Sequence, residues 1–445
     1  MHRRNVLKMA AMAGGLGVFT ERTAKMEAQV ARGTRGLPSP KIKDIQVIAT
    51  QPDGVRLTVV KILTDQDGLY GYGCGTFTQR AELVNAAVEK YLKPFLLGKE
   101  ADRIDDIWQA CYNSSYWRNG PVLNNAISGV DQALWDIKGR QCGVPVYQLL
   151  GGKCREAATC FATTGGRNYG EVVDSIRKLQ SAGYRHFRVN ANSRDGSAPR
   201  PAAPKSLVEG VRGDRATRLR TTYGLFEEIR KQLGDEPELM TDIHEGITPQ
   251  QAVQFAKDCE HFRLFFIEDI LSPEDIAYFR LIRQQCTTPM AMGELFNSPH
   301  EWTPLIAERL IDYIRLHVSQ AGGLTPCRKI AILGEFFGVK TAWHGPPDVS
   351  PVGQVAHLHL DLACYSFGIQ EYTGFSDRVK EVFSGCPRME GCYMYASEAP
   401  GYGMEVDEKA AARYPYGNSN EPPARKNLNG GWGESRLPDG TVIKM

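Results

Sequence analysis

Short apolar runs alternate with longer amphipathic stretches over most of the chain after Ala157. The apolar runs read HFRVN, ELMTDIH, LFFIEDI, MAMGE, YIRLHV, VKTAWHG and FGIQEY. The segments between them, such as PQQAVQFAKDCE and LTPCRKIAILGEFFG, carry apolar residues at helical spacing. Strands that alternate with helices of this length indicate βαβ units and a parallel sheet.

A polar or charged residue stands near the end of each of these seven runs, and Thr163 stands in the same way before the first of them. These residues are Thr163, Arg188, Asp242, Glu268, Glu294, His317, His344 and Glu371, with separations of 25, 54, 26, 26, 23, 27 and 27 residues. Apart from one long insertion, the spacing marks one residue for each of eight βα repeats. Eight repeats close into a barrel whose active site lies at the carboxyl ends of the strands. We therefore predict an α/β protein with a (β/α)8-type, TIM-like barrel over residues 156–386.

The chain before the barrel shows a different pattern. The runs DIQVIATQ, VRLTVVKILTD and LYGYGCGTF alternate β-branched and polar residues and are separated by turn residues, which is typical of antiparallel strands. Two helical patterns follow, RAELVNAAVEKYLKPFLLG and NNAISGVDQALWDIKGRQCG. We predict an N-terminal α+β capping domain over residues 41–155. Residues 387–445, rich in Gly, Pro and Tyr, are predicted to be a C-terminal extension that folds back on the molecule.

The first residues resemble an export signal. In HRRNVLKMAAMAGGLGVF, Arg3 and Arg4 precede a weakly apolar Gly/Ala-rich run, as in twin-arginine signals. We predict that residues 1–40 are such a signal with a linker and that the protein is exported to the periplasm. The alternative is a basic tail on a cytoplasmic protein.

Composition limits the partners and the use of cysteine. The 445 residues are 42% hydrophobic and 23% charged, with a net charge of +2, so no global charge attracts nucleic acid or a membrane. The eleven cysteines are scattered without a CxxC pair, which argues against a structural zinc site and a disulfide framework. We expect free thiols.

Three successive predicted strands end in carboxylates, Asp242, Glu268 and Glu294. Three acids at one barrel mouth repel one another unless a cation lies between them. Oxygen ligands from carboxylates suit Mg²⁺ or Mn²⁺. We predict a magnesium site held by these residues, and we expect Asp269 and Asp275 to cap the helix that follows.

Histidines supply groups that can transfer protons at the same mouth. His244 stands two residues after Asp242, so a continuing strand would point both side chains to one face. His317 and His344 end the sixth and seventh strands. Imidazoles titrate near neutral pH, so we predict His244, His317 and His344 as catalytic residues.

The motifs TDIH, FIEDI, MGELF, WHGPPDVSP and GIQEY, with ALWDIKGRQCGVPVYQLLGGK before them, resemble the enolase superfamily, and more closely its mannonate dehydratase-like acid-sugar dehydratases. The resemblance implies Mg²⁺-dependent dehydration of an acid sugar, a mannonate-like aldonate, to a 2-keto-3-deoxy acid through an ene-diolate. It implies His244 as the acid that expels the 3-hydroxyl, and a homo-oligomer. It also implies a substrate site formed by Arg188, His344, Asp348 and Glu371.

One group typical of these dehydratases is missing. They carry a tyrosine base in the loop after the second strand, but residues 193–222 contain no tyrosine, and Tyr223 reads as a first-turn helical residue. Thr163 replaces the histidine expected after the first strand. A His317–His344 pair could replace the missing base. Two alternatives also stay open: a racemase or epimerase that uses His344 and a second base, and a non-catalytic acid-sugar-binding relative.

Overall fold

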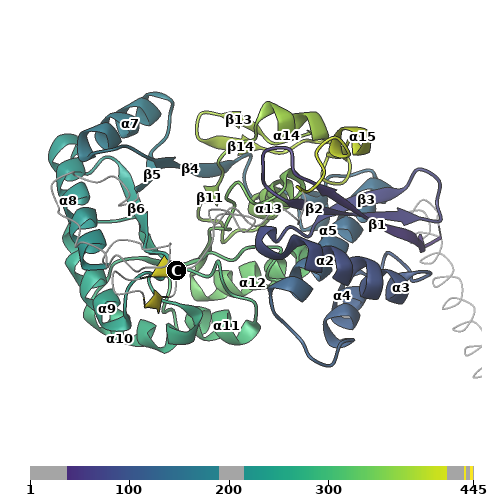
Figure 1. Ribbon diagram of the computed structural model, residues 1–445, viewed down its shortest axis with the longest axis horizontal. Coiled ribbons are helices and arrows are strands. Elements are labelled where there is room, and N and C mark those ends of the chain that lie inside the picture. The colour runs from purple at the N-terminus through teal and green to yellow at the C-terminus, as the bar shows by residue number, and fades with distance from the viewer. Residues whose placement is uncertain (1–37, 190–214, 418–434, 437–440, 444–445) are drawn as a thin grey trace, which may run out of the picture.

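The computed structural model describes residues 38–189, 215–417, 435–436 and 441–443. Figure 1 shows an N-terminal lobe of sheet and helices beside a larger barrel. Within the described ranges, no helix combines the length and apolar character that crossing a membrane requires. The predicted export signal lies almost entirely outside the described residues.

The N-terminal lobe is an antiparallel sheet with helices packed on it. Strands β1, β2 and β3 pair in chain order, as the alternating runs predicted. Helix α5 lies against β2 and β3 and buries most of its first five turns. The elements are β1 (Ile42–Thr50), β2 (Leu57–Thr64), β3 (Tyr70–Cys74), α2 (Ala81–Ala87), α3 (Lys93–Leu96), α4 (Ile104–Asn113), α5 (Pro121–Cys142) and α6 (Val146–Leu149), with short η1 (Thr78–Arg80) and η2 (Val88–Leu92).

Eight parallel strands form the predicted barrel. They pair in the order β10-β9-β8-β7-β6-β5-β4, and β11 also pairs with β4, again in parallel. A parallel bridge between Thr341 and Phe367, just before β11, closes the ring. The strands are β4 (Ala158–Thr164), β5 (His186–Val189), β6 (Glu238–Asp242), β7 (Phe266–Glu268), β8 (Met290–Met292), β9 (Tyr313–Ile314), β10 (Lys340–Thr341) and β11 (Gln370–Glu371). The prediction of a (β/α)8-type barrel is confirmed.

Helices surround the barrel between its strands. Thr248 and Ser298 begin α9 and α11 with capping boxes, in which side chain and backbone satisfy each other's hydrogen bonds. The helices are α7 (Tyr169–Ser181), α8 (Arg215–Leu233), α9 (Pro249–Asp258), α10 (Phe279–Gln285), α11 (Pro299–Ala307), α12 (Leu324–Phe337), α13 (Pro351–Ala363) and α14 (Asp377–Val382), with η3 (Glu260–Phe262) and η4 (Pro273–Tyr278).

The placement expected for Tyr223 is wrong. Helix α8 begins at Arg215, so Tyr223 lies in its middle and not in its first turn. Its hydroxyl donates to Asp258 on α9, 3.1 Å away, and its ring packs near Phe255. Tyr223 therefore belongs to the contact between two outer helices.

The barrel interior is filled by an apolar layer. It consists of Phe161, Met240, Phe266, Ala291, Tyr313, Ala342 and Ile369. Side chains two residues apart on a strand share a face, so the residues two positions further on also point inward, above this layer. Those residues include Asp242, Glu268, Arg315, His344 and Glu371. The sequence alternation thus delivers polar groups to the barrel mouth on top of an apolar floor.

Described residues after the barrel pair with earlier strands and with each other. Strand β14 pairs antiparallel with the first residues of β4, and β15 pairs with β12. The elements are β12 (Phe383–Ser384), β13 (Arg388–Glu390), β14 (Tyr393–Tyr395), β15 (Glu405–Val406), α15 (Glu408–Ala411), β16 (Ser435–Arg436) and β17 (Val442–Ile443). All eleven cysteines are free thiols, as expected from their spacing.

Candidate active site

A closed ring of four charged side chains lies above the apolar floor. Arg315 contacts Glu268 at 2.7 Å and Glu371 at 2.6 Å. Arg188 contacts the same two carboxylates at 3.3 and 2.7 Å. Both guanidinium groups lie over the ring of Phe161, at 5.2 and 5.8 Å from its centroid. Arg315, Glu268 and Glu371 are buried and Arg188 is partly exposed, and the two arginines and two glutamates neutralise each other.

The two glutamates of the ring differ in their affinity for a proton. Burial raises the pKa of Glu268 to about 7, against the opposing charges of Arg315 and Arg188. Burial alone would raise the pKa of Glu371 too, but Arg188 and Arg315 hold it well below its usual value. Glu371 also accepts a hydrogen bond from the backbone of Gly345 at 3.0 Å. Glu371 is thus a fixed anion, whereas Glu268 holds its charge only weakly without a cation.

Arg315 was missed in the sequence, although a signal for it was present. The run YIRLHV places Arg315 two residues after Tyr313 and two before His317. Arg315 lies in the middle of this run, so the pattern of polar residues near the strand ends does not include it. The period-two rule applied from Tyr313 would have found it.

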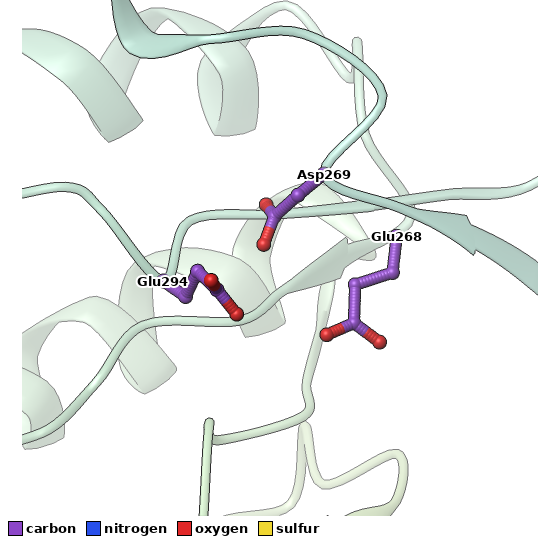
Figure 2. Close-up of side chains that lie close together, drawn as sticks. All are labelled: Glu268, Asp269 and Glu294. Carbon is purple, nitrogen blue, oxygen red and sulfur yellow. The ribbon is translucent and has the colours of Figure 1, made fainter. Parts of the chain in front are cut away.

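Three buried carboxylates converge beside this ring. Figure 2 shows Glu268, Asp269 and Glu294, and one oxygen from each lies within 4.8 Å of the others. The expectation that Asp269 caps the following helix is wrong. Ser272 begins that helix, while the Asp269 carboxylate turns inward and accepts a hydrogen bond from the backbone of Gly293 at 3.0 Å. Burial, together with the charge of Glu294, raises the pKa of Asp269 well above its usual value.

Asp242 lies next to this cluster. It pairs with Glu268 in the register of β6 and β7, and its charge helps to raise the pKa of Glu268 after burial and against the arginines. Four carboxylates therefore meet at the ends of three adjacent strands. The predicted triad of Asp242, Glu268 and Glu294 and the tight cluster differ only in whether Asp242 or Asp269 is the third member.

The backbone after two of these strands is unusual. His244, Glu245 and Asp269 have φ values of 52°, 55° and 41°, in the left-handed region that costs non-glycine residues on the order of 1–3 kcal/mol each. The strand alternation assumed for Asp242 and His244 therefore does not hold, because β6 ends at Asp242. The backbone N–H of Glu245 donates to the carbonyl of Asp269 at 2.8 Å, so the two turns support each other.

Glu294 is held between two histidines. Nε2 of His244 lies 3.1 Å from one carboxylate oxygen, and Nε2 of His344 lies 3.1 Å from the other. Burial alone would raise the pKa of Glu294, but His344 and His244 hold it well below its usual value. Gly293 has a φ of 138°, which residues with a side chain rarely adopt, and an added Cβ there would lie 3.2 Å from Phe296 and 3.3 Å from Ile314. Glycine therefore allows the turn that precedes Glu294.

The third predicted histidine lies behind the second. Nδ1 of His317 is 2.8 Å from Nδ1 of His344. Burial and the neighbouring His344 lower the pKa of His317 well below its usual value, whereas Glu294 outweighs burial and raises the pKa of His344. The structure thus brings together Glu294, His344 and His317, with His344 in contact with both of the others.

The remaining predicted positions lie around the same mouth. Burial raises the pKa of Asp348, which is also affected by His344, Glu294 and Glu371 and is therefore close to them. Thr163 pairs with Arg188 in the register of β4 and β5, and its side chain is exposed.

The acid residues fit a divalent cation. Six carboxyl groups, Asp242, Glu268, Asp269, Glu294, Asp348 and Glu371, gather near two guanidinium groups. Buried oxygens of Glu268 and Asp269 make no hydrogen bond with the described residues. Carboxylate oxygens are the ligands that Mg²⁺ prefers. A bound cation would offset the burial and charge repulsion that raise the pKa of Glu268 and Asp269.

Two family models match the chain. "Mandelate racemase / muconate lactonizing enzyme, N-terminal domain" matches residues 34–151, and "Enolase C-terminal domain-like" matches residues 171–410. The D-galactonate dehydratase family member RspA of Pantoea ananatis is 45% identical over 418 residues, which is 90% of this chain and 98% of that protein. The chain belongs to the enolase superfamily, in its acid-sugar dehydratase subgroup. A D-galactonate dehydratase family member of Enterocloster bolteae is 44% identical over 407 residues, covering 91% of this chain and 98% of that protein.

A solved structure of the superfamily supports the same assignment. The crystal structure of an enolase from Pantoea ananatis with bound D-gluconate and Mg has 44% identity and a TM-score of 0.86, covering 91% of this chain and all of that one. The resemblance first seen in the motifs is thus confirmed for the superfamily and the subgroup.

Proposed function

We propose that this superfamily member dehydrates an acid sugar, an aldonate, to a 2-keto-3-deoxy acid with the help of Mg²⁺. The observation that carries the proposal is the meeting of four carboxylates with His244 and His344 at one barrel mouth. The Mg and D-gluconate bound to the similar Pantoea ananatis protein support the metal and the substrate class. A mannonate-like aldonate, which the motif resemblance implied, is the narrower form of the proposal.

Asp242, Glu268 and Glu294 would hold the cation, as the sequence predicted. They come from the ends of three adjacent strands, and Asp242 is the more exposed of the four acids, which suits a ligand at the entrance. Asp269 is already held by the backbone of Gly293, so we assign it to positioning. A bound Mg²⁺ would hold the substrate carboxylate and stabilise the negative charge that forms when C2 loses its proton.

His344 and His244 would carry the protons. His344 has a raised pKa, so it can accept the C2 proton, and the contact of its Nδ1 with His317 orients the ring. His244 approaches from a different strand and would donate a proton to the departing 3-hydroxyl. Arg188 and Glu371, with Asp348, would bind the substrate's polar groups.

The placement of His244 and His344 on the two oxygens of Glu294 also favours a second function. If His344 removed the C2 proton and a second base returned a proton to the opposite face of C2, without loss of the 3-hydroxyl, the protein would be a racemase or epimerase. The two functions differ in whether His244 donates to the 3-hydroxyl or returns a proton to C2.

The test is incubation of the Mg²⁺-loaded protein with D-gluconate, D-mannonate and D-galactonate in D₂O, followed by NMR. D-Gluconate and D-mannonate differ only at C2, which becomes the keto carbon, so both would give one 2-keto-3-deoxy product. Because their C2 hydrogens point to opposite faces, a single base at His344 predicts dehydration of only one of the two. The variant His344→Asn is the control for enzyme-dependent chemistry.

Each outcome separates the alternatives. Formation of a keto acid supports the dehydratase. Deuterium at C2 with epimer formation and no keto acid supports the racemase. Saturable binding of all three sugars, with neither reaction, supports a relative that only binds acid sugars and would overturn the proposed activity.

A further inference from the structure

Three side chains of the N-terminal lobe hold the barrel segment of residues 318–325, which comprises the loop 318–323 and the start of α12. Trp108 on α4 donates its indole N–H to the carbonyl of Gly322 at 2.8 Å. Asn124 on α5 donates to the carbonyl of Gln320 at 2.8 Å. Asp131, about two turns further along α5, accepts a hydrogen bond from the backbone N–H of Thr325 at 2.9 Å. The loop that follows His317 is thus built against the N-terminal lobe.

Two glycines allow this close approach. An added Cβ on Gly322 would lie 3.2 Å from the Trp108 ring, and one on Gly323 would lie 2.5 Å from the Asp131 carboxylate. Both glycines have positive φ, at 102° and 113°. The loop therefore has no room to shift toward the lobe, and the hydrogen bonds from Trp108 and Asn124 oppose a shift away from it.

Asn124 differs from Trp108 and Asp131 because its side chain contacts two barrel loops. Its side-chain nitrogen donates to the carbonyl of Gln320 at 2.8 Å and to the carbonyl of Asn297 at 2.9 Å. The same nitrogen also lies 3.3 Å from the side-chain oxygen of Asn119. An amide nitrogen has two hydrogens, so the two short bonds use both of them. Asn124 is only 2% exposed, so water does not compete for these bonds.

The two loops follow Glu294 and His317, which are the two partners of His344. Asn297 stands three residues after Glu294, and Gln320 stands three residues after His317. Between them, His344 touches Glu294 with Nε2 and His317 with Nδ1. The separation of the two loops therefore sets whether His344 can contact both partners at once.

We propose that Asn124, in the N-terminal lobe, is a positioning residue of the active site. It holds the loops of Glu294 and His317 at the separation that lets His344 bridge them. The kinetic part of this inference rests on the proposed function, whereas the metal and histidine parts do not. A misplacement of about 1 Å can cost about 10²-fold in rate, and loss of an outer partner of a metal site costs about 10–100-fold in affinity.

The test compares Asn124→Asp with Asn125→Asp in the full chain. Asn124→Asp keeps the size of the side chain but replaces both donated hydrogens by an acceptor facing two carbonyls. Asn125 is a matched control because it is fully buried in the same helical turn and donates to Pro121 of its own helix, not to the barrel. Circular dichroism and thermal unfolding establish that both variants fold.

The expected result is specific to Asn124. Asn124→Asp should shift the imidazole ¹H–¹⁵N signals of His317 and His344 and weaken Mn²⁺ binding about 10-fold. It should also lower kcat on the acid sugar at least 10-fold with a smaller change in KM, while Asn125→Asp should lose stability only. If no acid sugar is turned over, the proposed function fails, but the histidine signals and Mn²⁺ affinity still decide the role of Asn124. Unchanged signals and affinity in a folded Asn124→Asp variant, or equal changes in both variants, would overturn the inference.

Discussion

His317 and His344 meet through their Nδ1 atoms, 2.8 Å apart, with His317 buried and His344 partly exposed at the barrel mouth. One Nδ1 must carry a hydrogen and the other must accept it, so the tautomer of each ring depends on its partner. Since Nε2 of His344 faces Glu294, both nitrogens of His344 are engaged. Glu294 and His317 therefore fix the orientation of the His344 ring.

The contact between the two histidines should affect proton removal. His317→Leu removes the partner of His344, and we expect the rate of C2 deuterium exchange to fall about 10²-fold, within the range for general base catalysis. His317→Asn can keep a hydrogen bond to Nδ1 of His344 and should lose less than about 10-fold by the same reasoning. NMR of the acid sugar in D₂O measures both rates. Equal losses in the two variants would show that the contact itself has no role.

The third ligand of the cation can be decided by paired substitutions. Asp242→Asn should weaken Mg²⁺ binding by at least about 100-fold if Asp242 is a ligand, whereas Asp269→Asn, acting through the turn at Gly293, should weaken it by about 10-fold. Titration calorimetry of each variant with Mg²⁺ gives the two affinities. A larger loss for Asp269→Asn would assign the site to the cluster of Figure 2 and would refute the ligand set predicted from the sequence.

Arg315 should stabilise the metal-free protein. Arg315→Met leaves Glu268 and Glu371 buried with only Arg188 to neutralise them, and breaking such an ion pair costs about 3–5 kcal/mol. Because a bound cation supplies positive charge beside Glu268, added Mg²⁺ should recover part of the loss. Urea unfolding with and without Mg²⁺ measures both effects. A variant as stable as the parent without metal would contradict the role given to the ring of charges.

His359 should make the fold sensitive to acid. Its Nδ1 accepts the backbone N–H of Tyr147 at 3.0 Å, and burial lowers the pKa of His359 from 6.5 to about 3. A base with a lowered pKa in the folded state stabilises the fold above pH 6.5 and loses that stability as the pH falls toward 3. Between pH 7.5 and 5 the loss is about 2 kcal/mol.

The variant His359→Asn isolates this effect. The asparagine oxygen can replace Nδ1 as the acceptor for Tyr147 but does not titrate, so the free energy of unfolding should change less between pH 7.5 and 5. His300→Asn, at an exposed histidine, serves as the control. An identical acid sensitivity in the parent and in His359→Asn would contradict the prediction.

The sequence predicts the barrel because its signal is local and repeated. Each strand is a short apolar run, and each delivers a polar residue at nearly constant spacing, so the residues from Asp242 to Glu371 could be assigned to one mouth. Turn geometry could not be predicted in the same way. Asp269 was expected to cap a helix, yet its left-handed backbone turns the carboxylate into the site.

Contacts between distant segments were the other gap. Nothing in the residues around Asn124 indicates that its amide reaches Asn297 and Gln320, because those partners lie 173 and 196 residues away. Arg315 was hidden for a different reason, since it lies inside an apolar run and only its strand register shows that it points inward. Periodicity predicts which face of a helix or strand a side chain occupies, but it does not predict which distant residue that side chain contacts.

The pairing of β14 with the start of β4 has a consequence for the integrity of the whole protein. Thr159 pairs with Tyr393, whereas β5 joins the same strand only from Ala162 onward. The backbone hydrogen-bonding groups at the beginning of β4 are therefore covered by the chain's own later segment. A chain cut before β13 would present this stretch as an unprotected strand edge, which is a template for edge-to-edge association with other molecules. The segment that contains β13 and β14 thus protects this edge of β4 from association with other molecules.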